Sequence, residues 1–135
     1  MENFTFKKEE RLCSKRLIDS LFHNGSSFVL YPFRIVFWVT ADLDATAQVI
    51  ISVPKRRFKK AVSRNLLKRR IREAYRLQKQ TNLYAQLPLN QGSLLFAIQY
   101  VGKTTLSFTE ISAKLGLALQ RMQHESHPLY LAKNN

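Results

Sequence analysis

The chain has 135 residues, 45% of them hydrophobic, which suits one domain with a single core and leaves no room for a separate catalytic domain. Its formal net charge of +13 favours a polyanionic partner. The single cysteine excludes an intramolecular disulfide, and no apolar run is long enough to cross a bilayer. No secretory leader is expected at the N-terminus, so a cytoplasmic protein is the simplest interpretation.

The N-terminal region predicts one short helix. Ser14 can cap it, because a hydroxyl at this position accepts a hydrogen bond from the first turn. Asn24-Gly25 supplies the stop. The apolar residues that recur at helical spacing between these signals are Leu17, Ile18, Leu21 and Phe22.

Two or three strands follow. The stretch Phe28–Thr40 is rich in aromatic and β-branched residues and is interrupted at Pro32, which predicts a short edge strand and then a strand from Phe33. Residues 42–45 read as a turn, since Asp42 and Asp44 lie among small residues. The apolar run 47–53 predicts the next strand, which ends at Pro54.

The C-terminal half contains a further strand and helix. A loop with proline and glycine spans residues 83–92, and residues 94–101 read as a buried strand. Ser107 and Glu110 fit a capping box that opens the last helix. Its apolar stripe consists of Phe108, Ile111, Leu115, Leu119 and Met122. From Glu125 the chain is polar and contains Pro128, so we expect a structured core at about residues 11–123 and a frayed tail at 125–135.

The predicted order is α-β-β-β-α-β-α. This order indicates an α+β fold in which a small four-stranded sheet packs with helices. We expect residues 1–135 to form one domain. The basic segment in its middle predicts that this is an RNA-binding domain.

The stretch Lys55–Arg76 holds eleven of the 22 lysines and arginines and a single acid, Glu73. As a helix from about Ala61, its residues advance by about 100° each and separate an apolar side from a basic side. The apolar side has Leu67, Ile71, Ala74 and Tyr75, and the basic side has Asn65, Lys68, Arg69, Arg72 and Arg76.

Like charges repeat at four-residue spacing in this helix, at Arg64, Lys68, Arg72 and Arg76. Such pairs destabilise an isolated helix unless something neutralises them, and phosphates would do so. A charged run is usually a solvated face, but this density exceeds what solubility requires. A membrane surface is disfavoured, because the apolar side is narrow and has no Trp or Phe.

The sequence of this segment resembles the signature of the bacterial ribonuclease P protein family. The matching residues are Ile51-Ser52-Val53, Lys55-Arg56, Ala61-Val62-Ser63-Arg64-Asn65 and Lys68-Arg69-Arg70-Ile71-Arg72-Glu73-Ala74-Tyr75, with Arg11-Leu12, Phe22 and Gly25 upstream. There are two departures. Leu66 stands where the family's RNR triplet has its second arginine, and the loop before Ala61 looks one residue longer and carries Phe58 and Lys59 where a glycine is common.

The resemblance implies a four-stranded sheet with a left-handed crossover at the basic helix. It implies that the partners are the catalytic RNA of ribonuclease P and precursor tRNA, with no membrane and no obligate protein partner. The RNA would remove the 5′ leader by Mg²⁺-dependent hydrolysis, the Mg²⁺ being held mainly by the RNA and the substrate. The protein would strengthen substrate and metal binding by the RNA, and it would supply no catalytic residues and no metal ligands.

Two sets of residues are predicted to contact RNA. Phosphates need cationic side chains on a rigid element, and the predicted set is Lys55, Arg56, Arg64, Asn65, Lys68, Arg69, Arg72 and Arg76. The resemblance places the single-stranded leader in a central cleft, where stacking surfaces and charge suit a variable sequence. Alternation along the strand from Phe33 then selects a leader-binding set of Phe22, Arg34, Val36 and Trp38.

Other interpretations remain open at this stage. Phe22 at helical spacing could belong to the core, and Asn65 could bond to local backbone. Another class of protein, a structural RNA-binding protein of the ribosome or a ribosome-associated factor, would share the charge and size. Only the segment from Ser52 to Tyr75, with the aromatic strand, favours ribonuclease P over it.

Overall fold

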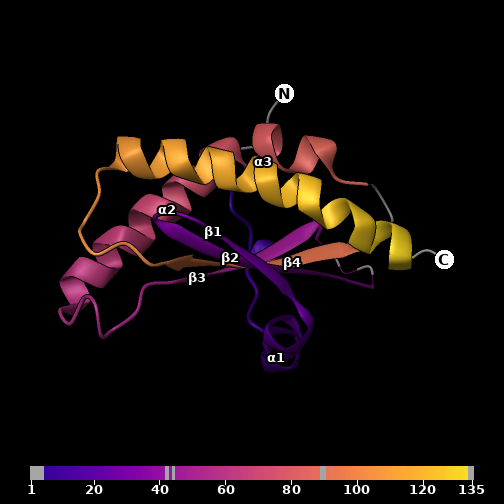
Figure 1. Ribbon diagram of the computed structural model, residues 1–135, viewed down its shortest axis with the longest axis horizontal. Helices are drawn as coiled ribbons and strands as arrows, with labels where there is room; N and C mark the ends of the chain where they lie inside the picture. The colour runs from indigo at the N-terminus through magenta and orange to yellow at the C-terminus, as the bar shows by residue number, and fades with distance from the viewer. Residues whose placement is uncertain (1–4, 42, 44, 89–90, 134–135) are drawn as a thin grey trace.

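The computed structural model describes residues 5–41, 43, 45–88 and 91–133. A long helix and the basic helix lie on one side of a sheet, and a short helix lies on the other (Figure 1). Asp42 and Asp44 of the predicted turn lie outside the described residues. The elements in chain order are η1 (Lys8–Glu10), α1 (Lys15–Asn24), β1 (Ser26–Leu30), β2 (Phe33–Thr40), β3 (Ala47–Ser52), α2 (Ala61–Asn82), η2 (Tyr84–Gln86), β4 (Ser93–Tyr100) and α3 (Phe108–Lys133).

The four strands form one sheet in the order β1-β2-β4-β3. β2 is antiparallel to β1 and β4, whereas β3 is parallel to β4. Parallel neighbours require a crossover connection, and α2 supplies it. The mixed α+β class with a four-stranded sheet is confirmed, and the left-handedness of the crossover stays a prediction.

The helix ends follow the predicted signals. The Ser14 hydroxyl accepts a hydrogen bond of 3.3 Å from the Leu17 amide. At the start of α3 the Ser107 hydroxyl accepts from the Glu110 amide at 3.2 Å and donates to the Glu110 carboxylate at 3.0 Å. Gly25 caps the C-terminal end of α1 and lies where a Cβ would collide with the Leu21 carbonyl oxygen and with Val36. Glycine therefore lets the chain pass from α1 into β1 directly against the sheet.

Each face of the sheet has its own apolar core. α2 and α3 cover the face that presents Phe33, Ile35 and Phe37 of β2, together with Phe96 and Ile98 of β4. α1 covers part of the opposite face, where its buried leucines pack on β2 and β4. We call this second face the open face, because among the described residues one short helix, α1, covers part of it. Its buried apolar cluster consists of Leu12, Leu17, Leu21, Val36, Leu95 and Ala97.

The expectation of a frayed tail from Glu125 is wrong for residues 125–133. α3 continues to Lys133, with Pro128 inside it. Tyr130 is only 1% exposed, and Leu129 packs against the main core. The apolar stripe therefore extends past Met122 at helical spacing, and its packing offsets the backbone hydrogen bond that a proline removes from a helix.

Candidate nucleic-acid interface

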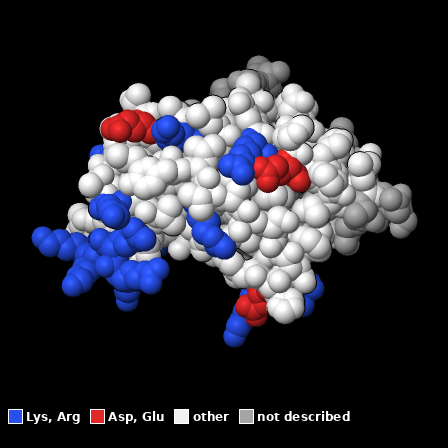
Figure 2. All heavy atoms as spheres, viewed as in Figure 1, with Lys and Arg blue, Asp and Glu red and all other residues white. Residues whose placement is uncertain are grey.

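The basic loop between β3 and α2 is anchored by an aromatic side chain. Phe58 is buried, and its ring lies 5.7 Å from that of Tyr100 at the end of β4. Lys55, Arg56 and Lys59 on either side of it are exposed. Figure 2 shows lysines and arginines gathered at the end of the molecule where this loop enters α2. The loop therefore presents charge from a fixed backbone.

α2 begins at Ala61 and has the two sides that its sequence predicts. Leu67, Ile71, Ala74 and Tyr75 are fully buried against the sheet and α3. Asn65, Arg69 and Arg72 are exposed, and Lys68 is half-buried. The apolar side fixes the helix, and the opposite side is left for a ligand.

The predicted phosphate-binding residues differ in what their side chains already contact. Arg64 donates hydrogen bonds to the carbonyl oxygens of Phe58 at 2.8 Å and Lys59 at 2.9 Å. The Arg76 guanidinium forms an ion pair with the Glu73 carboxylate at 2.5 Å. Hydrogen bonding between the two side chains raises the pKa of Arg76 and lowers the pKa of Glu73. The other cations have no polar contact with a described residue: Lys55, Arg56, Lys68, Arg69 and Arg72.

Arg64 therefore contacts the protein's own backbone, a contact that the sequence did not indicate. Its guanidinium reaches back over the start of α2 and binds the carbonyl oxygens that the loop presents there. Sequence periodicity places a residue on a side of its own helix, but it does not indicate a contact with the preceding loop. RNA contact by each of the eight predicted residues stays a prediction.

Two arginines of the segment have structural contacts that the sequence analysis did not identify. Arg57 donates to the carbonyl oxygen of Val101 at 3.2 Å, and Arg70 donates to that of Leu106 at 2.5 Å. Both acceptors lie in the chain that follows β4. These contacts join the basic segment to the β4–α3 connection, and no sequence signal distinguished these two arginines from their neighbours.

The alternation along β2 is as predicted. Phe33, Ile35 and Phe37 enter the main core, whereas Arg34 and Trp38 lie on the open face and are half-buried. Arg34 donates to Gln99 at 2.7 Å and to Ser27 at 3.4 Å, so its guanidinium is held between β4 and β1.

The leader-binding set is not equally accessible. Val36 is 3% exposed and packs beneath α1, so it lies in the second core instead of offering a surface. Phe22 is 46% exposed, which excludes a purely core position for it. The register places Ser52 beside Gln99 and Ile50 beside Ala97 on the same face, and the sequence analysis missed these β3 residues because strand register is not readable from alternation alone.

The described residues offer little to hold a metal. No three of their His, Cys, Asp or Glu side chains come together. None of the helices, over the part of the chain that the structure describes, is both long and apolar enough to cross a bilayer. The exposed cations of the basic loop and α2 include Lys55, Arg56, Arg69 and Arg72, and such side chains suit phosphate groups.

Comparison with protein families matches residues 6–123 to the family described as ribonuclease P. The chain belongs to the ribonuclease P protein family. The match includes the basic loop, α2 and the open face. It favours this family over a structural protein of the ribosome.

Individual members of the family are similar in sequence to this chain. The chain is 43% identical over 77 residues to the ribonuclease P protein component of Porphyromonas gingivalis, and 41% identical over 80 residues to that of Petrotoga mobilis. The aligned parts cover 56% and 58% of this chain, respectively. They span only 56% and 64% of the relatives' own lengths.

Solved structures of the family have the same fold. The ribonuclease P protein of Thermotoga maritima superposes with a TM-score of 0.65 at 25% identity, covering 83% of this chain and 96% of that one. The protein of Staphylococcus aureus gives 0.64 at 17% identity over 85% and 95% of the two chains, which supports the fold alone.

Proposed function

We propose that this chain is the protein subunit of ribonuclease P, the endoribonuclease that removes the 5′ leader of precursor tRNA. The observation that carries this proposal is the row of cations on the side of α2 that faces away from the core, where Lys68, Arg69 and Arg72 have no polar contact with any described residue. Cations held in this way leave their donors available for phosphates. The subunit binds the catalytic RNA through this row and through Lys55 and Arg56.

The open face is the proposed site for the leader. Arg34 is held by Gln99 and Ser27, so its charge is fixed in place, and Trp38 and Phe22 offer aromatic surface. A positively charged groove with aromatic side chains binds single strands without reading their sequence. Precursor tRNA would therefore contact the protein through its leader, and mature tRNA would lack that contact.

Hydrolysis in this proposal belongs to the RNA. Mg²⁺ is held by the RNA and the substrate, where phosphate oxygens supply the oxygen ligands that it prefers. The protein's cations reduce the repulsion between the two RNAs and so strengthen substrate binding. The proposed RNA partners are cytoplasmic, and the protein would act there.

Reconstitution tests the proposal directly. The protein is mixed with the ribonuclease P RNA of the same source, and cleavage of precursor tRNA is measured at low Mg²⁺. We expect cleavage at the 5′ end of the mature tRNA only when both components are present. Correct cleavage by purified protein freed of RNA, or no effect of the protein on the RNA's activity, would contradict it.

A further inference from the structure

The described residues before α1, residues 5–14, are fixed to the edge of β3, although their only helical element is the single turn η1. Arg11 pairs with Val49 in a parallel bridge, and the Leu12 amide donates to the Val49 carbonyl oxygen at 2.9 Å. The Gln48 side chain donates to the backbone oxygen of Glu9 at 2.9 Å. These contacts align the segment with the sheet.

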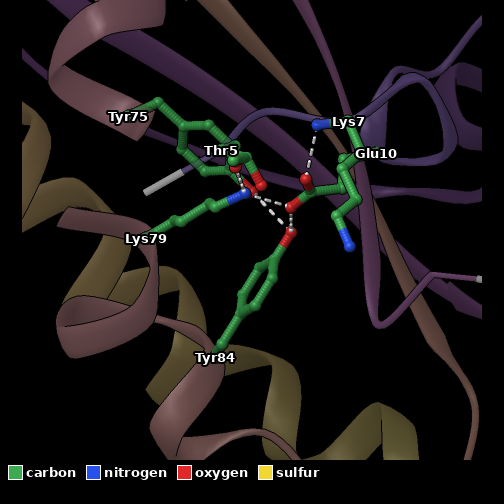
Figure 3. A network of polar contacts seen from close by, with 6 residues as sticks. All are labelled: Thr5, Lys7, Glu10, Tyr75, Lys79 and Tyr84. Carbon is green, nitrogen blue, oxygen red and sulfur yellow. Dashed lines mark hydrogen bonds and ion pairs between the residues drawn. The ribbon is translucent and has the colours of Figure 1, made fainter. Parts of the chain in front are cut away.

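A buried polar network holds the same segment to the end of α2 (Figure 3). The Glu10 carboxylate pairs with Lys79 and accepts hydrogen bonds from the Tyr84 hydroxyl at 2.6 Å and the Lys7 amide at 2.8 Å. Lys79 also donates to the backbone oxygen of Thr5. Because the acid is buried and paired, the segment's exposed charge is dominated by Lys7, Lys8 and Arg11.

Between this segment and α2 lies a hollow of about 290 Å³. Two guanidinium groups, those of Arg11 and Arg72, line it. The other residues that line it have apolar side chains: Phe6, Leu12, Val49, Ile50 and Ile51. The hollow therefore crosses the outer edge of β3 and combines two cations with an aliphatic floor.

Neither cation has an anionic partner among the described residues. Arg72 has no polar contact there, and Arg11 lies over the Phe6 ring at 5.5 Å from its centroid. Phe6 is itself fixed, because its ring packs edge-on against Tyr75 at 5.7 Å. Arg11 is thus preorganised on an anchored backbone with its hydrogen-bond donors available.

We propose that the segment Phe6–Leu12 is an RNA-binding element and that Arg11 and Arg72 hold the sugar-phosphate backbone of the catalytic RNA across the edge of β3. The inference rests on the proposed function and extends the proposed RNA-binding surface from α2 to the N-terminal segment beside it. One guanidinium group can donate two hydrogen bonds to a phosphate group. Aliphatic side chains can contact riboses without distinguishing between bases. Arg72 lies one helical turn beyond Lys68, so the hollow continues the row of cations proposed for the same RNA.

Arg11→Ala tests the element, with Lys8→Ala as the matched control. Lys8 is an exposed cation of the same segment that does not line the hollow. Binding of each full-length variant to the ribonuclease P RNA is titrated over a range of salt. We expect Arg11→Ala to raise the Kd about tenfold and to lower the magnitude of the log-affinity versus log-salt slope by about one. Lys8→Ala should change the Kd less than about twofold.

The double variant Arg11→Ala, Arg72→Ala tests whether the two arginines bind the same RNA segment. If Arg11 and Arg72 hold one RNA segment, the double Ala variant should lose less affinity than the two single losses combined. Arg11→Gln keeps the side-chain carbons as far as Cδ and removes the charge, and it repeats the test if Arg11→Ala melts at lower temperature.

The outcomes separate this inference from the proposed function. Reconstituted cleavage with an Arg11→Ala Kd and slope equal to wild type overturns the RNA-binding element and leaves the proposed function intact. An affinity loss confined to precursor tRNA with a leader, with unchanged binding of the catalytic RNA, overturns the assignment to the catalytic RNA. Equal losses for Arg11→Ala and Lys8→Ala overturn the hollow as the site.

Discussion

Arg64 donates a hydrogen bond of 2.8 Å to the carbonyl oxygen of Phe58. The contact joins the first turn of α2 to the loop that precedes it, and Phe58 joins the same loop to Tyr100 in the core. Arg64 thus fixes the backbone from which Lys55 and Arg56 project. An arginine of a phosphate-binding motif can act in this way by shaping its own loop.

Arg64→Ala should therefore destabilise the protein as well as weaken RNA binding. The half-exposed guanidinium makes two hydrogen bonds to backbone oxygens, and we expect a loss of about 1 kcal/mol in the free energy of unfolding. Urea denaturation measures it. Lys68→Ala is the control, because its ammonium has no polar contact with the described residues, and its stability should match wild type. Equal stability of the two variants would contradict the loop contact.

The cations without protein partners should behave differently. The triple variant Lys68→Ala, Arg69→Ala, Arg72→Ala should keep its melting temperature within a few degrees, because these side chains contact no polar group of the described protein. Its salt slope for binding the catalytic RNA should fall by about 2 to 3 units, one counterion release being lost per contact. An unchanged slope would show that this side of α2 is only a solvated face.

The sequence predicted the class of the fold because its strongest signals were local. The caps at Ser14 and Ser107, the apolar side of α2 and the alternation in β2 each depend on a few neighbouring residues, and the structure confirms them. Each of these signals acts through backbone or side chains within one element.

The features that could not be predicted from the sequence depend on contacts between distant elements. Glu10 and Lys79 are 69 residues apart in the chain, and nothing in either neighbourhood indicates that they pair. The continuation of α3 past Pro128 follows from the packing of Tyr130, which overrides the local cost of proline. Strand alternation placed Val36 in the cleft, because alternation cannot show that α1 covers this residue.

The leader site can be tested through Phe22, which is 46% exposed on α1. Phe22→Ala should weaken binding of precursor tRNA to the reconstituted complex by about 1–3 kcal/mol, the typical loss for one stacking aromatic. Mature tRNA should bind as before, because it has no leader. Leu131→Ala, at an exposed apolar residue on α3, is the control and should change neither. Equal losses for the two tRNAs would remove Phe22 from the leader site.

The Glu10–Lys79 pair predicts how stability depends on pH. Burial raises the pKa of Glu10, but hydrogen bonds from Lys79, Tyr84 and the Lys7 amide outweigh it, and the pKa is lowered. A carboxyl whose pKa is lower in the folded state stabilises the protein above its unfolded pKa of about 4.3, and the contribution is lost as the pH falls through the folded value. At neutral pH the contribution is fully present.

Glu10→Gln should lower the free energy of unfolding at pH 7 by about 3 kcal/mol or more, because it leaves Lys79 buried without its anionic partner. The difference from wild type should begin to shrink as the pH falls below the unfolded pKa of about 4.3, and it should continue to shrink until the folded wild-type carboxyl, whose pKa is lowered, is protonated as well. Denaturant unfolding at a series of pH values measures both effects. Glu9→Gln is the matched control, since Glu9 is the exposed neighbour and should show almost no difference at any pH. A Glu10→Gln deficit that stayed constant between pH 7 and pH 3 would mean that the ionised carboxylate is not what holds the N-terminal segment to α2.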